Sequence, residues 1–464
     1  MSEQRVDAPS PYRAPRCAAG LDASMSRHVA VLGGGISGLA AAHQLSKRGH
    51  RVTLLEADAQ LGGLGSTFEH AGIPIERFYH CLLPTDAALL RLVGEIGLGG
   101  EVIWRNVGMG FMVDRRTFPL NGALDLLRFS PLPIFDRLRL GWMGLRARAQ
   151  GANPALDSVS ARDWIVGLAG ERVFERLWRP LLEAKLGEGA GGIPALWLAS
   201  RIAREKGNGV EVKGYVPGGY RALVAAIERA LAARGSELRV KCPVQKVGIA
   251  GERVVVDSAS GRETFDSAVA ALPLVEFQRI ARDVPETAPL AGLRLDYQGV
   301  VNGVFLLRRP LTPYYWLPIM ESGATSQGIV ETSNLVPPER TGGLHVVYLL
   351  NYVHRTSELF RRPDAEVLAL YRRDLLALYP GVEKDIEAQY LFRAPFVEPI
   401  WPLGFRTKRP GPVVVPGKLY LASTAQVYPR INAWDSCCGV AEEMAAAFAA
   451  EARAAAKLEP VAKV

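Results

Sequence analysis

Cysteine is scarce in this sequence, and long apolar runs are missing from it. Five cysteines among 464 residues form an odd set without a CxxC pair or a histidine-rich companion segment, so neither a disulfide framework nor a metal site is indicated. A reducing, cytoplasmic location is therefore expected. Arginine, glycine and proline interrupt every apolar run well short of the roughly 20 residues that a membrane-spanning helix needs. The first 25 residues also lack the apolar core of a secretory signal.

The composition is that of a globular chain with a strong positive charge. Hydrophobic residues make up 48% and charged residues 22% of the sequence, which excludes a disordered, collagen-like or coiled-coil protein. The length predicts two or three domains. A net charge of +8 fits either anionic partners or arginines that are simply scattered over the surface. The basic residues are spread out and no nucleic-acid motif is present, so a nucleic-acid partner is not expected.

The chain begins its predicted ordered structure with a β-α-β unit. His28 to Leu32 is a short apolar run typical of a buried strand, and Ile36 to Arg48 has apolar residues at helical spacing. Arg51 to Leu55 predicts a second strand that ends in Glu56. An acidic side chain at that place accepts hydrogen bonds from an adenosine ribose. The unit therefore predicts dinucleotide binding.

The turn between the first strand and the helix follows the G-x-G-x-x-G pattern. Gly33 permits the tight turn, Gly35 lets a pyrophosphate approach the backbone, and Gly38 lets helix and strand pack closely. The amides at the helix start, around Ile36 and Ser37, carry the partial positive charge that favours a diphosphate. A glycine-rich turn of purely structural purpose does not explain the acid at the end of the second strand.

The rest of the chain predicts a domain interrupted by two insertions. Helices are expected at Ala87 to Gly97, Tyr220 to Arg234 and Asp435 to Lys457, and strands of a separate sheet at Val300 to Leu307 and His345 to Leu350. The expected division is a disordered extension at 1–25, with Met1 or Met25 as the start, a nucleotide-binding domain at 26–75, 212–285 and 405–460, and a second domain at 76–211 and 286–404.

Four landmarks carry a resemblance to a known superfamily. The run from Val29 to Gly63 resembles the N-terminus of FAD-dependent oxidoreductases of the amine oxidase, protoporphyrinogen oxidase and phytoene desaturase superfamily. Tyr215 to Val247 is similar to its "PGG" segment and the strand that touches adenine. Ser267 to Pro273 resembles its "VVxxxP" strand, and Lys418 to Ser423 its closing strand. The landmarks stand in the superfamily's order across nearly the whole chain after Met25.

The resemblance implies an α/β fold and a non-covalent FAD. The fold would be a Rossmann-like FAD-binding domain of the GR2 flavoprotein type, with a second, α+β substrate-binding domain built from the insertions. Leu64 and Ser423-Thr424-Ala425 depart from the residues that many members carry, and no segment matches the cysteine of covalent amine oxidases. The implied FAD-binding residues are Gly33, Gly35, Ile36, Ser37, Gly38, Glu56, Ala57, Gly62, Gly63, Val244, Ser423 and Thr424.

Three residues are candidates for catalysis. His80, on a segment that the resemblance places beside the flavin, is either a proton shuttle or a hydrogen-bonded structural histidine. Lys185 is either a site for an anionic substrate or a solvated lysine at a helix end. Arg430 either faces a phosphate or carboxylate near the flavin or forms a surface salt bridge.

One further segment bears on partners. Arg137 to Arg148 mixes arginine with Leu, Trp and Met at roughly helical intervals. Such a helix either packs on the second domain or lies on an anionic bilayer with Trp142 at the interface. Peripheral contact with the inner membrane face and a lipid-like small-molecule substrate are therefore among the expectations.

The residues and the resemblance leave three functions open. The leading hypothesis is an FAD-dependent oxidoreductase, of desaturase or oxidase type, that acts on a mostly apolar isoprenoid, lipid-linked or polycyclic substrate. A second is non-redox flavin catalysis on a nucleotide sugar, because Glu76 to His80 also resembles UDP-galactopyranose mutases. A third is a non-enzymatic prenyl-protein carrier of the GDP-dissociation-inhibitor type, which the intact glycine turn disfavours.

Overall fold

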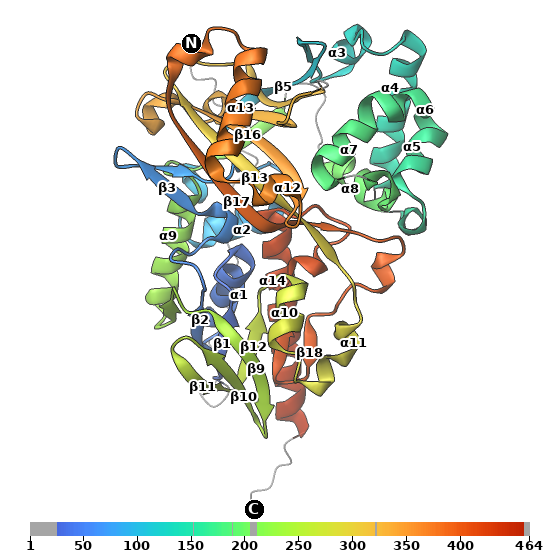
Figure 1. Ribbon diagram of the computed structural model, residues 1–464. Coiled ribbons are helices and arrows are strands. Elements are labelled where there is room, and N and C mark those ends of the chain that lie inside the picture. The colour runs from blue at the N-terminus through green and yellow to red at the C-terminus, as the bar shows by residue number, and fades with distance from the viewer. Residues whose placement is uncertain (1–25, 152, 188, 205–210, 321–322, 459–464) are drawn as a thin grey trace, which may run out of the picture.

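Two β-sheets dominate the structure, which is a computed structural model (Figure 1). It describes residues 26–151, 153–187, 189–204, 211–320 and 323–458. The expected extension at 1–25 lies outside the described residues. Among the helices that are described, none combines the length and the apolar character that crossing a bilayer requires.

The smaller main sheet has six strands in the order β18-β19-β12-β1-β2-β8. All pair in parallel except β18, which is antiparallel to β19. The central strand β1 reads HVAVL, and its last four residues are fully buried. Such a continuous apolar run is what a parallel strand covered on both faces needs. The strands are β1 (His28–Leu32), β2 (Arg51–Leu55), β8 (Glu237–Arg239), β12 (Ser267–Ala270), β18 (Val413–Val415) and β19 (Leu419–Leu421).

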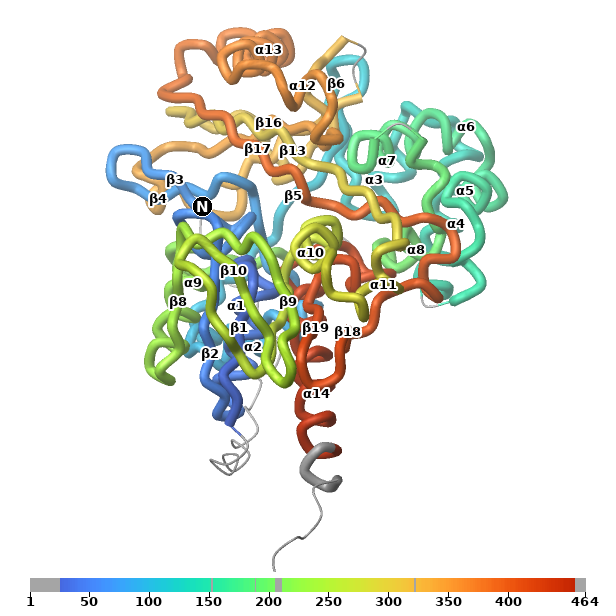
Figure 2. The backbone as a smooth tube through the Cα atoms, turned by 60° about the horizontal axis from the view of Figure 1, so that its bottom comes forward, coloured from blue at the N-terminus to red at the C-terminus, as the bar shows by residue number. Residues whose placement is uncertain are grey.

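Helices pack around this sheet. Every residue of α1 (Ile36–Ser46) is buried, because the helix packs against both α14 (Trp434–Leu458) and α9 (Gly219–Ala232). Figures 1 and 2 show α14 running along the sheet beside α1. The N-terminus of α14 packs against α2 (Ala87–Glu95). Around them lie α10 (Leu274–Ile280), α11 (Ala288–Ala291), the hairpin β3 (Thr67–His70) and β4 (Ile73–Glu76), and the antiparallel sheet of β9 (Val244–Ala250), β10 (Arg253–Ser258) and β11 (Gly261–Phe265).

The larger sheet has eight strands in the order β17-β13-β16-β15-β14-β5-β6, with β7 paired to β5. Alternate residues of β13 serve two cores: Val301 and Phe305 face one, while Val300 and Val304 face the other. The helices α12 (Glu358–Arg361) and α13 (Asp364–Leu378) lie beside this sheet. The strands are β5 (Ile103–Val113), β6 (Arg116–Pro119), β7 (Glu211–Tyr215), β13 (Asp296–Leu307), β14 (Tyr314–Pro318), β15 (Gly328–Glu331), β16 (His345–His354) and β17 (Ile386–Ile400).

A helical lobe stands beside the larger sheet, at the upper right of Figure 1. Its long helix α4 packs against α5 and α8, and α7 reaches β16. A π-helical turn at Phe174–Trp178 joins α6 to α7. The helices are α3 (Ala123–Arg128), α4 (Ile134–Gln150), α5 (Ala161–Ala169), α6 (Glu171–Val173), α7 (Arg179–Leu186) and α8 (Ala195–Arg204).

The sheets give a more exact division of the chain than the sequence did. The expected boundary at residue 212 falls inside β7, and β7 pairs with β5 of the larger sheet. The six-stranded sheet takes its strands from 28–55, 237–270 and 413–421. The chain thus leaves the larger sheet after Tyr215, at the start of the "PGG" turn, and continues toward the six-stranded sheet.

Candidate functional site

The glycine turn lies at the carboxyl end of β1, in the middle of the six-stranded sheet. Gly33 has a φ of +104°, a conformation that suits glycine. A Cβ at Gly38 would lie 1.8 Å from the Gly33 carbonyl oxygen, so helix and turn touch as the motif predicts. At Gly35, by contrast, an added Cβ would meet nothing within 4 Å. The turn therefore has one open position, and it is the one at which the motif expects a pyrophosphate.

This open position fits a dinucleotide. The orphan amides at the start of α1 lie beside it, including those of Ile36 and Ser37. Gly62 and Gly63 close the turn from one side: the Gly62 amide donates to the Gly34 carbonyl at 2.8 Å, and a Cβ at Gly63 would lie 3.2 Å from the Gly35 Cα. The two glycine segments thus border a space that larger side chains at these positions would fill.

Glu56 stands at the end of β2, beside the turn. Its Oε1 accepts from the Asp58 amide at 2.7 Å, and its Oε2 accepts from the Gly34 amide. Each carboxylate oxygen keeps a second lone pair for a ribose hydroxyl. The Cys242 amide donates to the Glu56 carbonyl at 2.7 Å, which brings the start of β9, and with it Val244, next to this corner. Ala57 is exposed there.

Ser423 and Thr424 follow β19 at the same edge of the sheet. The Ser423 hydroxyl donates to the Leu272 carbonyl at 2.7 Å and, with Gln426, forms a capping box. The Thr424 hydroxyl lies 3.3 Å from the Tyr297 hydroxyl. The hydroxyls of both residues are thus engaged in contacts within the protein.

His80 lies in an aromatic cluster at the start of the last helix. Its ring packs on Tyr220 at 4.5 Å and lies edge-on to Trp434, the first residue of α14, at 6.0 Å. Its Nδ1 is 2.8 Å from the Phe78 carbonyl oxygen, so Nδ1–H donates and Nε2 is the acceptor in the neutral ring. The Glu76 carboxylate lies 3.4 Å from the same nitrogen.

Glu76 ties this cluster to the "PGG" turn. It accepts from the Tyr220 amide at 2.9 Å, at the N-terminus of α9. The Tyr220 hydroxyl donates to the Cys81 carbonyl at 3.0 Å. A Cβ at Gly65 would come within 2.4 Å of the Trp434 ring. The segment that follows Gly63, the His80 segment and α14 are therefore packed together.

Lys185 belongs to a second cluster beside His80. Its Nζ lies 3.9 Å from the centre of the Tyr352 ring and 3.4 Å from the Glu398 carboxylate. Glu398 is 1% exposed, and burial raises the pKa of its carboxyl while Lys185 and Arg201 lower it. The carboxylate also lies 3.5 Å from the Asn432 amide, just before α14. Lys185 thus lies at the end of α7, as one expectation had it, but its ammonium is partly buried and paired with Glu398.

Aromatic rings enclose this second cluster. The hydroxyls of Tyr79 and Tyr352 are 3.0 Å apart. Tyr79 also stacks on Trp316 at 6.3 Å and tilts against Tyr348 at 6.1 Å. Burial raises the pKa of Tyr352 to about 12 and that of Tyr79 as well. Both phenols therefore stay neutral and can donate.

Arg430 is not joined to either cluster by any contact the structure records. Its guanidinium lies 3.3 Å from the Glu443 carboxylate and against Gly439, both on α14, and its side chain is 40% exposed. The structure therefore supports the surface salt bridge, which was the alternative expectation. Within the described ranges, no three His, Cys, Asp or Glu side chains gather as a metal site.

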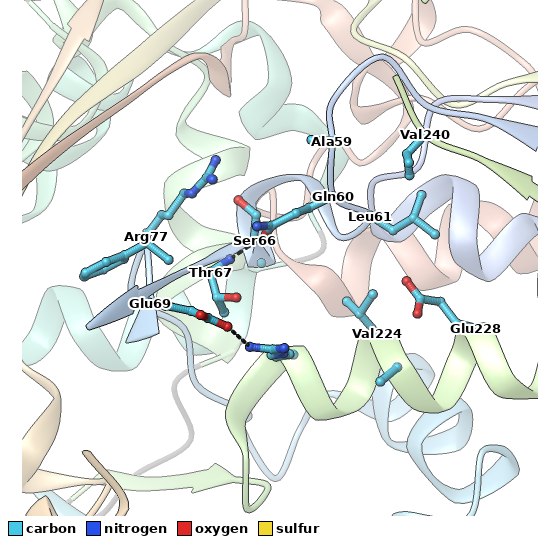
Figure 3. Close-up of a pocket in the computed structure, with 14 residues that line it drawn as sticks. Ala59, Gln60, Leu61, Ser66, Thr67, Glu69, Arg77, Val224, Glu228 and Val240 are labelled. Atoms are coloured by element: carbon cyan, nitrogen blue, oxygen red, sulfur yellow. Dashed lines mark hydrogen bonds and ion pairs between the residues drawn. The ribbon is translucent and has the colours of Figure 1, made fainter. Parts of the chain in front are cut away.

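A separate hollow of about 490 Å³ lies between the 59–69 segment and α9 (Figure 3). Ser66, Thr67 and Val224 line it, and Arg221 donates to Glu69 across it at 3.3 Å. Neither Gly35 nor Glu56 is in its lining. It is therefore distinct from the space above the glycine turn.

The comparisons with known proteins agree with this geometry. The sequence model of the family described as flavin containing amine oxidoreductase matches residues 36–431, so the chain belongs to that family and its cofactor is FAD. The third hypothesis, a carrier without flavin chemistry, is thereby set aside.

Individual relatives are more distant. AofH of Mycobacterium tuberculosis, which is named as a flavin-containing monoamine oxidase, is 27% identical over 283 residues, 55% of this chain and 59% of that protein. The zeta-carotene desaturase of Zea mays is 26% identical over 209 residues, 38% of this chain and 34% of that protein. The chain thus matches little more than half the length of the first relative and about a third of the second.

A solved structure confirms the fold. A protein from Exiguobacterium sp. 255-15, named as a protoporphyrinogen oxidase, has a TM-score of 0.72 at 17% identity and covers 92% of this chain and 99% of its own. The expected class, a Rossmann-like FAD-binding domain with an α+β second domain, is therefore confirmed.

Sequence reasoning did not find Glu76, Tyr79, Arg201, Tyr352 or Glu398 as site residues. Each lies in a different element or loop, and the larger sheet and the helical lobe bring them together. The one signal available was the Glu76 to His80 segment, in which an acid precedes a histidine by four residues. No spacing in the sequence connects Lys185 with Glu398.

Proposed function

We propose that the protein is an FAD-dependent oxidoreductase of the desaturase or oxidase type whose substrate is mostly apolar, such as an isoprenoid, lipid-linked or polycyclic compound. Family membership and the similarity to a zeta-carotene desaturase support the reaction type. The open position above Gly35, with Glu56 beside it, supports the place of the cofactor.

The cofactor contacts follow from the turn. The backbone of Gly33, Gly35 and Gly38 and the first amides of α1 would hold the pyrophosphate, and Glu56 the ribose. Val244 would lie near the adenine, with Ala57 beside it. Gly62 and Gly63 would leave room for the phosphates, and Ser423 and Thr424 would contact the flavin part of the cofactor.

The observation that carries the substrate class is the set of aromatic rings around Lys185. The buried carboxylate of Glu398 already pairs with Lys185 at 3.4 Å, so it is not free to bind a protonated amine. The rings of Tyr79 and Trp316 instead offer large apolar faces. A neutral or partly anionic apolar substrate therefore suits this site better than an amine.

The side chains then have distinct tasks. When bound, FAD supplies the acceptor for the two electrons that leave the substrate. Nε2 of His80 accepts a proton from the substrate region, because its Nδ1–H is fixed on the Phe78 carbonyl. Lys185 holds a polar or anionic end of the substrate. The N-terminus of α14, which begins at Trp434, would stabilise negative charge on the reduced cofactor if the flavin binds beside it.

Anaerobic titration of the purified holoprotein tests this function. Isoprenoid, polycyclic and other lipid-like compounds, alkylamines and a UDP-hexose are added, and the loss of flavin absorbance is followed. Bleaching by the apolar compounds is expected. Bleaching by alkylamines alone would overturn the substrate class. Conversion of the UDP-hexose that requires reduced flavin, with no net use of reductant, would show a mutase instead.

A matched pair of variants tests the role of Lys185. Lys185→Met keeps the side-chain length and removes the charge, and at least about a tenfold slower bleaching is expected, equivalent to about 1.4 kcal/mol of transition-state stabilisation. Lys246→Met removes an exposed lysine that pairs with Asp283 at 2.8 Å and serves as the control. Equal rates in the two variants, with FAD retained, would remove Lys185 from the mechanism.

A further inference from the structure

The helical lobe exposes an unusual concentration of large apolar side chains. Nine such residues are exposed in the described chain, and seven of them lie between residues 124 and 145. Phe135 is 75% exposed and Trp142 55% exposed. Single exposed apolar residues need no explanation, but a contiguous group marks an interaction surface. We call this group the α3–α4 face: Leu124, Leu127, Ile134, Phe135, Leu138, Trp142 and Leu145.

The helix α4 is apolar on two opposite sides. At about 100° per residue, Ile134, Leu138, Trp142 and Leu145 fall within about 80° of one another. The buried residues of α4, among them Leu140 and Met143, lie roughly on the opposite side and pack toward α5 and α8. Packing within the lobe therefore explains one apolar side of the helix and leaves the other to solvent.

Arginines flank the exposed stripe on both sides. On the same helical projection, Arg139 and Arg146 lie on one side of the stripe and Arg137 and Arg148 on the other. The Arg146 guanidinium lies 5.9 Å from the Trp142 ring. Residues 123–150 contain five arginines against two aspartates.

Both aspartates of this segment are already engaged in other contacts. Asp136 is buried and pairs with Arg172 at 3.3 Å. Asp125 accepts from the backbone and side-chain amides of Asn121. Beside the stripe, a hollow of about 590 Å³ is lined by Phe135, Leu138 and other residues of α4 and α6. The face thus combines apolar side chains, basic flanks and a recess.

We propose that the α3–α4 face binds the surface of an anionic lipid bilayer, with α4 lying in the plane of the interface. A helix with an apolar stripe between arginines has the pattern of an interfacial helix. Arg137 donates to the Leu127 and Leu132 carbonyls, which fixes α3 beside the start of α4 and joins both into one face. A second copy of the chain is a poorer occupant, because two such faces would bring arginine against arginine.

Membrane binding by the α3–α4 face would bring the protein to a lipid-like substrate. This role rests on the proposed function. The helix α8 packs against the buried side of α4, and its Arg201 lies close enough to affect Glu398, Tyr79 and Tyr352. The lobe that contacts the bilayer therefore also helps to form the Lys185 cluster.

Co-sedimentation of the FAD-loaded full chain with vesicles tests the proposal. Binding to vesicles of phosphatidylcholine with phosphatidylglycerol is expected, with much weaker binding to phosphatidylcholine alone and a decrease at high salt. Phe135→Ser combined with Trp142→Ser should weaken binding about a hundredfold or more, since each side chain contributes about tenfold or more. Arg146→Gln should weaken binding to the anionic vesicles only.

The controls separate the remaining outcomes. Leu403→Ser removes an exposed apolar side chain outside the face and should leave binding unchanged. Vesicle binding that survives the double substitution overturns the proposal, as does a dimer in solution that the double substitution dissociates. Vesicle binding does not require turnover, and flavin bleaching does not require vesicles. Absence of vesicle binding therefore counts against the α3–α4 face alone, and absence of flavin bleaching counts against the proposed function alone.

Discussion

Replacing Gly35 with alanine is expected to separate cofactor binding from folding. The backbone at Gly35 has φ −69° and ψ 178°, which alanine adopts without strain. An added Cβ would meet nothing within 4 Å. The stability of the chain without cofactor should therefore change by no more than about 1 kcal/mol. The Cβ would, however, occupy the space that the proposed pyrophosphate needs.

The size of the effect follows from this crowding. Inserting a methyl group into a filled space costs about 1–3 kcal/mol, which corresponds to FAD binding that is about 5- to 160-fold weaker. Gly38→Ala should behave differently, because its Cβ would lie 1.8 Å from the backbone oxygen of Gly33. That variant should lose stability as well as FAD.

The assay compares FAD content after desalting, the dissociation constant from titration of the apoprotein, and the melting temperature of the apoprotein. Gly167→Ala, in α5, also meets nothing within 4 Å and should retain FAD fully. The reasoning is refuted if folded Gly35→Ala binds FAD as tightly as the unaltered chain. It is also refuted if Gly35→Ala and Gly38→Ala lose stability equally.

The pKa shifts predict two effects on stability. Burial, followed by the charge of Arg27, lowers the pKa of His50 to about 4. Between about pH 6.5 and 4 the unfolded chain therefore binds a proton at His50 that the folded chain does not bind, so the stability of the fold should decrease as the pH falls through this range. In His50→Gln the melting temperature should depend less on pH in the same range. Hydrogen bonds, the strongest of them from His43, lower the pKa of Glu95 to about 2. The ionised Glu95 should therefore stabilise the folded chain above about pH 4.5, and this stabilisation should be lost as the pH falls toward 2. Glu95→Gln should lower the melting temperature at neutral pH.

The glycine turn was predictable from the sequence because it is local. The strand, the turn, the helix and the second strand follow one another within about thirty residues, and the hydrophobic period changes with each element. The structure places them at His28–Leu32, Ile36–Ser46 and Arg51–Leu55, which confirms the expected elements apart from two residues at the end of the helix. The last expected helix is also confirmed, and it begins at Trp434, one residue before the expected Asp435.

The Lys185 cluster was not predictable, because tertiary packing alone creates it. Lys185 lies at the end of α7, Glu398 near the end of β17 and Tyr352 in β16. A buried glutamate is costly unless a cation lies close by, yet nothing in the sequence around Glu398 shows that it is buried. The pairing of β7 with β5 was not predictable for the same reason, since β5 precedes β7 by about a hundred residues.

The two proposals predict different kinetic effects for the same substrate. The α3–α4 face lies on the outer side of α4, so Phe135→Ser with Trp142→Ser changes how much substrate the protein encounters and should raise the apparent KM for substrate held in anionic vesicles. Lys185 lies beside Glu398 and Tyr352, so Lys185→Met removes the proposed contact to the substrate and should lower kcat. The vesicle dependence should vanish for a substrate short enough to dissolve in water, whereas the effect of Lys185→Met should persist. If the double substitution instead lowers kcat for the water-soluble substrate, the face supports the site through α8 rather than through a membrane.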